Sequence, residues 1–144
     1  MALKYLCLVL CVTFFAMETY GRKDFVAYKR SLSFFQAFQQ CRLYGGYLAF
    51  IESAEENAQV VTAIKAVGDL TSEWYIGATD LGFEGRFVWF GVNKRVSYMN
   101  FNGGEPNNIN GEHCIVIGSN AGSKWNDVSC EYKAAGFVCA FISM

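Results

Sequence analysis

Two short segments of the chain carry side-chain oxygens that could bind a hard metal ion. One is the stretch GGEPNNINGEHC, and the other is KWNDVSC. Five of their side chains supply three carboxylates and two amide carbonyls, the mixture of charged and neutral oxygen ligands that Ca²⁺ prefers. The sequence therefore predicts a Ca²⁺ site made by Glu105, Asn107, Glu112, Asn126 and Asp127.

Other metal chemistries fit these residues poorly. Softer metals favour thiolate and imidazole ligands, which this set lacks. The chain has no C-x-x-C motif, and its one histidine, His113, has no partner histidine for a zinc site. An EF-hand is excluded because placing Gly111 at its sixth position puts Pro106 at the first, where an aspartate is required.

The single proline of the chain, Pro106, lies between Glu105 and Asn107. An X-Pro bond adopts the cis form at a cost of only about 0.5–1 kcal/mol. A cis bond here would turn the loop and direct both flanking oxygens toward one ion. The alternative is an ordinary turn proline in a glycine-rich loop, and the local sequence leaves both open.

The N-terminal segment has the features of a signal peptide. A lysine at position 4 precedes the apolar run LCLVLCVTFF, and Thr19 and Gly21 suit the small positions of a cleavage site. The run is too short for the roughly 20 apolar residues of a spanning helix. We expect residues 1–21 to be removed and residues 22–144 to be secreted as one domain without membrane insertion.

Four cysteines remain after that cut, an even number in an oxidising compartment, so two disulfides are expected. Spacing alone does not choose among their three pairings. The formal charge of −1 and the absence of any Lys or Arg run argue against a nucleic-acid partner.

Two helices and several short strands must position these groups, which indicates an α+β fold. Ser33 with Gln36, and Ser53 with Glu56, form capping-box patterns that begin helices ending near Gly45 and Gly68. Strands are expected near residues 25–28, 47–50, 74–78, 86–90, 113–117 and 136–141. The Asn- and Gly-rich segment between Phe90 and His113 is expected to be a long functional loop.

Four motifs in this order resemble the C-type lectin carbohydrate-recognition domain: WYIG at 74–77, EPN at 105–107, GEHC at 111–114 and WND at 125–127. With the four cysteines, the resemblance covers the chain from about Phe25 to Phe141. It implies disulfides Cys41–Cys139 and Cys114–Cys130. It also implies a cis Glu105–Pro106 bond when the ion is bound, and the five predicted ligands binding both Ca²⁺ and sugar.

The resemblance also implies the class of sugar. The E-P-N order is similar to that of mannose-type lectins, so mannose, fucose, glucose or N-acetylglucosamine is favoured, with galactose as the alternative. A single sugar should bind weakly, so a homo-oligomer would be needed for avidity. Innate recognition of glycans is the biological setting that the resemblance suggests.

Several residues lend themselves to more than one interpretation. Asp80 and Glu84 lie where an auxiliary Ca²⁺ site occurs in some relatives, but Asn108 and His113 replace acidic residues there. We expect that site to be weak or absent, with Asp80 and Glu84 solvated and His113 on the surface. The three tryptophans and the phenylalanines at 34, 35 and 38 are expected in the core.

Two other functions compete with sugar binding. A module of this fold could bind a protein instead of a sugar. The presence of all five predicted Ca²⁺ ligands argues against that function. A glycosidase could use Glu105 and Glu112 as its acid and nucleophile. Both carboxylates would be ion-bound and ionised, however, so the chain is predicted not to be an enzyme.

Overall fold

The computed structural model describes residues 21–144, in which two helices lie among eight short strands. The predicted signal peptide falls outside these residues except for Gly21. In chain order the elements are β1 (Arg22–Tyr28), α2 (Phe34–Leu43), β2 (Tyr47–Leu48), α3 (Ala54–Lys65), β3 (Glu73–Thr79), β4 (Val88–Trp89), β5 (Lys94–Arg95), β6 (Cys114–Gly118), the 3-10 turn η1 (Ser119–Ala121), β7 (Trp125–Val128) and β8 (Gly136–Ser143). The α+β class is confirmed.

Both helices begin at the predicted serines. Ser33 and Gln36 form the full capping box: the Ser33 hydroxyl accepts from the Gln36 N–H, and the Gln36 side chain accepts from the Ser33 N–H. α2 ends at Leu43, and Gly45 follows with φ of +89°, which suits a residue without a Cβ. At α3, Ser53 caps the Glu56 N–H at 3.1 Å.

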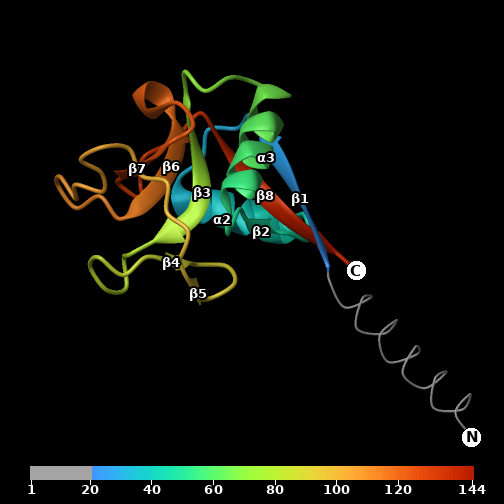
Figure 1. Ribbon diagram of the computed structural model, residues 1–144, viewed down its shortest axis with the longest axis horizontal. Coiled ribbons are helices and arrows are strands. Elements are labelled where there is room, and N and C mark those ends of the chain that lie inside the picture. Colours follow the sequence, from blue (N-terminus) through green and yellow to red (C-terminus); the bar gives the residue numbers. More distant parts are fainter. Residues whose placement is uncertain (1–20) are drawn as a thin grey trace, which may run out of the picture.

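The strands form one branched sheet with β3 at its centre. β1 pairs along its full length with β8, so the two ends of the described chain lie side by side (Figure 1). β3 pairs with β8 in parallel and with β4 and β6 antiparallel. Among the described strands, β7 pairs with β6, and in Figure 1 it lies with the long loops at the left of the view.

The core contains all three tryptophans, as predicted. Trp74, Trp89 and Trp125 are almost fully buried, and the Trp125 indole N–H donates to the Asn57 side chain at 2.8 Å. The prediction was wrong for Phe35, which is 38% exposed. It lies one position off the buried face of α2 and packs edge-on against its neighbour Phe34.

Both implied disulfides are present. Cys41 of α2 is bonded to Cys139 of β8, with their Cα atoms 5.5 Å apart. Cys114 of β6 is bonded to Cys130 just after β7, at 5.0 Å. Within residues 21–144, no helix is long and apolar enough to cross a membrane.

Candidate metal centre

β7 carries two adjacent candidate ligands, Asn126 and Asp127. Because successive residues of a strand face opposite sides, only one of them can point into the domain. Asp127 is 1% exposed, whereas Asn126 is half-buried. A nearly buried carboxylate needs charged or hydrogen-bonding partners, so the surroundings of Asp127 define the site.

The long loop is held against β7 by Trp125, the first residue of the strand. The Trp125 N–H donates to the carbonyl of Asn100, and its own carbonyl accepts from the Asn102 N–H, both at 2.9 Å. The rings of Tyr98 and Phe101 meet the Trp125 indole edge-on, with centroids 5.8 and 5.5 Å away. The loop therefore runs beside β7, and the EPN triplet follows immediately.

Hydrogen bonds bring three predicted ligands together. The Asp127 carboxylate accepts the backbone N–H groups of Asn107 at 3.1 Å and Asn108 at 2.7 Å. The Asn107 side-chain NH₂ donates to Glu105 at 2.8 Å. The Glu105–Pro106 peptide bond is cis. Glu105, Asn107 and Asp127 thus form one cluster from two distant parts of the chain.

Glu112 returns to this cluster through a tight turn. Asn108, Asn110 and Gly111 all have positive φ, a conformation that asparagine and glycine tolerate better than other residues. After the turn, the His113 N–H donates to the carbonyl of Val128 at 3.1 Å, which places Glu112 next to the end of β7.

The carboxylates are close enough to perturb one another. Burial, followed by the neighbouring Asp127 carboxylate, raises the pKa of Glu105 to about 7. Burial and Asp127 also raise the pKa of Glu112. Three like charges crowded in this way favour a bound cation, which would stabilise the ionised forms.

Asn126 provides a further test of fit. Its side-chain carbonyl oxygen is buried and has no hydrogen-bond partner among residues 21–144. An unpaired buried acceptor is costly unless something outside the described atoms satisfies it. With the carboxylates and Asn107, this oxygen completes a donor set that suits Ca²⁺, so the residues fit the implied ion.

A second cluster lies beside this one and corrects two expectations. Asp80 is 3% exposed rather than solvated, and one of its oxygens is 2.9 Å from Nδ1 of His113. Glu84 approaches the same nitrogen at 3.1 Å, so His113 is half-buried and paired rather than a plain surface residue. The sequence missed this contact because Asp80 and His113 are 33 positions apart.

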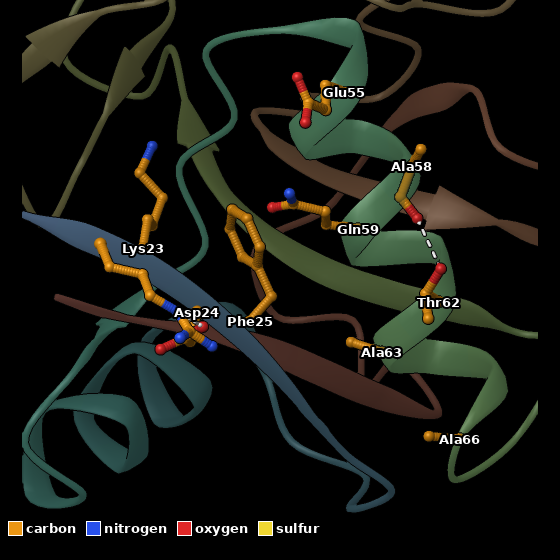
Figure 2. Close-up of a pocket in the computed structure, with 10 residues that line it drawn as sticks. Lys23, Asp24, Phe25, Glu55, Ala58, Gln59, Thr62, Ala63 and Ala66 are labelled. Carbon is orange, nitrogen blue, oxygen red and sulfur yellow. Dashed lines mark hydrogen bonds and ion pairs between the residues drawn. The ribbon is translucent and has the colours of Figure 1, made fainter. Parts of the chain in front are cut away.

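A hollow between β1 and α3 contains none of the predicted ligands. It measures about 630 Å³. Figure 2 shows the Phe25 ring directed toward α3, where alanines and Thr62 form the opposite wall. The hydroxyl of Thr62 donates to the Ala58 carbonyl within its own helix. This wall offers no cluster of metal-binding oxygens.

Comparison with known proteins gives a consistent result. The family model described as the Lectin C-type domain matches residues 30–141. A perlucin-like protein of Mytilus galloprovincialis is 39% identical over 104 residues, which cover 72% of this chain and 66% of that protein. A mannose-binding protein of Gallus gallus is 36% identical over 99 residues, covering 69% of this chain but 36% of the relative.

Solved structures share the fold. The cow carbohydrate-recognition domain of CD23, crystallised in the presence of a GlcNAc2Man3 oligosaccharide, superimposes with a TM-score of 0.75 at 28% identity, covering 87% of this chain and 92% of that one. The matched family consists of lectin domains, which bind carbohydrate and are not enzymes, in agreement with the prediction for this chain. By sequence and by fold, this chain belongs to the C-type lectin domain family.

Proposed function

We propose that residues 22–144 form a Ca²⁺-dependent carbohydrate-recognition domain that is secreted after loss of residues 1–21. The ion would be held by Glu105, Asn107, Glu112, Asn126 and Asp127. When bound, it would supply two coordination positions to neighbouring sugar hydroxyls. The same five side chains would bind those hydroxyls by hydrogen bonds.

One observation carries the proposal. Asp127 holds the backbone of Asn107 and Asn108, and the preceding residue of β7, Asn126, has a buried side-chain oxygen with no hydrogen-bond partner among residues 21–144. Two segments about 20 residues apart thus present their oxygens together. A structural role alone would leave neither the crowded carboxylates nor the orphaned amide oxygen explained.

The proposed sugar class rests on donor and acceptor order. A carboxylate only accepts hydrogen bonds, whereas an amide can also donate. Glu105 offers an acceptor and Asn107 a donor, and the hydrogen bond of 2.8 Å from the Asn107 amide to Glu105 supports that assignment. We propose mannose, fucose, glucose or N-acetylglucosamine as the ligand, a choice supported by the mannose-binding relative. A homo-oligomer would raise the avidity of such weak sites, in a role in innate glycan recognition.

The test is a glycan array probed with and without a chelator, using the mature chain. We expect retention on mannose-type glycans with Ca²⁺ present and loss of retention with the chelator. The variant Asp127→Asn should weaken Ca²⁺ binding at least about tenfold, the lower end of the losses seen when metal sites are perturbed. The exposed Glu55 on α3 provides the matched control, and Glu55→Gln should leave both properties intact.

Retention that survives chelation would refute the proposal. Binding of Ca²⁺ without binding of any glycan would instead favour a protein-interaction module. Retention on galactose-type glycans alone would keep the Ca²⁺ site and overturn the proposed sugar class.

A further inference from the structure

A small polar hollow adjoins the proposed ion site. It measures about 210 Å³, and Glu105 and Asn126 form part of its wall. The remaining wall comes from Asn102 in the long loop, Glu73 at the start of β3, and the turn η1 between β6 and β7. The hollow is therefore continuous with two of the five residues proposed to bind the ion and the first sugar.

Backbone hydrogen bonds hold this wall in place. The Asn102 N–H donates to Trp125, and the Asn102 carbonyl accepts from the Glu105 N–H, both at 2.9 Å. In the turn η1, the Ser119 N–H donates to the carbonyl of Ser72 at 3.1 Å, which ties the turn to the segment before β3. A hollow walled by such fixed segments is pre-formed for a ligand.

The side chains of this wall retain unused hydrogen-bonding capacity. Asn100, two residues before Asn102, is hydrogen-bonded at both the nitrogen and the oxygen of its side-chain amide: the NH₂ donates to the Ser123 carbonyl, and the oxygen accepts from Lys124. By contrast, within residues 21–144 no hydrogen bond involves the side chains of Asn102, Ser119 or Asn120. Amides and hydroxyls both donate and accept, as sugar hydroxyls do.

The charges in the wall restrict the ligand further. Its ionisable groups are the carboxylates of Glu73 and Glu105, and it contains no lysine or arginine. A sulfated or sialylated unit would meet like charge there, which costs binding energy. The wall is therefore suited to a neutral unit rich in hydroxyls.

We infer that this hollow is a second saccharide subsite, which takes the neutral sugar unit linked to the one held at the ion. The inference rests on the proposed function, because the first sugar must dock through Glu105 and Asn126. Asn102 of the long loop and Asn120 of η1 form the specific contacts with this second sugar unit. The preferred ligand is then an oligosaccharide rather than a single sugar.

The test is calorimetry with Ca²⁺ in excess, comparing methyl α-mannoside with the three mannobioses linked α1–2, α1–3 and α1–6. The best mannobiose should bind about threefold to tenfold tighter than the monosaccharide, as one or two net hydrogen bonds would provide. In Asn102→Ala/Asn120→Ala that advantage should vanish while monosaccharide affinity is unchanged. Both asparagines are exposed, so the variant should fold. The exposed Gln59 of α3 gives the amide control, Gln59→Ala.

The outcomes separate the two proposals. If the monosaccharide binds but no mannobiose binds tighter, or if the double variant weakens both ligands equally, the subsite is overturned and the lectin proposal stands. If galactosides bind instead of mannosides, the affinities for methyl β-galactoside and lactose are compared in the same way. If no sugar binds with Ca²⁺, both proposals fall.

Discussion

The side chains of Glu105 and Asn107 face each other across Pro106, with the amide NH₂ donating to the carboxylate at 2.8 Å. This contact survives if the two groups exchange places, because Gln at position 105 can donate to Asp at position 107. The order in which a sugar meets acceptor and donor would then be reversed. Sugar preference can thus be tested without removing the pair.

We predict that Glu105→Gln/Asn107→Asp keeps Ca²⁺ binding and shifts the ratio of mannose to galactose affinity by at least about tenfold, or about 1.4 kcal/mol. The physical reason is that each ring hydroxyl pair needs a matching acceptor and donor. Competition by the two free sugars against an immobilised glycan measures the ratio. The single change Asn107→Asp is the control, since it places two carboxylates together. An unchanged ratio in the double variant would contradict the assigned order.

At the site, the sequence suggested which residue types meet but not how they are held. The oxygen-rich residues pointed to Ca²⁺ because their side chains are chemically distinctive. The two hydrogen bonds that the Asp127 carboxylate accepts from backbone N–H groups could not be predicted from the sequence. Their donors belong to the main chain, and every residue except proline carries such a donor. The pairing of Asp80 with His113 was missed for a related reason, since nothing local links the two.

Among the elements, β7 was not one of the predicted strands, although it carries two of the predicted ligands. Its residues alternate between buried and half-buried positions, as a strand should. One of its two buried positions is Asp127, however, where alternation leads one to expect an apolar residue. A buried carboxylate therefore hides the alternation of polar and apolar residues by which a strand is predicted. The capped helices were predicted more closely because Ser33 and Ser53 give local start signals.

Lys23 joins β1 to α3 and to the segment that precedes α3, and it provides a test at this scale. Its ammonium contacts Glu52 at 2.9 Å, Glu56 of α3 at 2.7 Å and the face of Phe50, and its side chain is 14% exposed. We predict that Lys23→Met lowers the free energy of unfolding by about 1.5–3 kcal/mol, because two carboxylates lose a charged hydrogen-bond donor. Denaturant unfolding measures the change.

Arg22 is the matched control on the same strand. It pairs with Asp24, but the two side chains are 80% and 45% exposed, and such surface pairs contribute little. Arg22→Met should therefore change stability by less than about 0.5 kcal/mol. Equal losses in the two variants would show that Lys23 does not join β1 to α3.

Two disulfides brace different elements of the whole molecule, although their four cysteines belong to one buried cluster. Cys41–Cys139 closes a span of 98 residues and joins α2 to β8, neither of which carries a predicted ligand. Cys114–Cys130 closes a span of 16 residues and brackets β7, which carries Asn126 and Asp127. The first should therefore govern global stability and the second the geometry of the ion site.

We predict that two double variants rank in opposite order for loss of stability and for loss of Ca²⁺ affinity. In the chain-entropy model, Cys41→Ala/Cys139→Ala should lose about 4–5 kcal/mol of stability and Cys114→Ala/Cys130→Ala about 3 kcal/mol. Ca²⁺ affinity should be weakened only by the second, because its loss frees the strand that positions the ligands. At a Ca²⁺ concentration 100 times the dissociation constant, the ion adds about 2.7 kcal/mol to the stability of an intact site. Unfolding with and without Ca²⁺ should therefore give that full increment for the first variant and less for the second. An equal increment in both would mean that the long loop, anchored on Trp125, holds the site without the second disulfide.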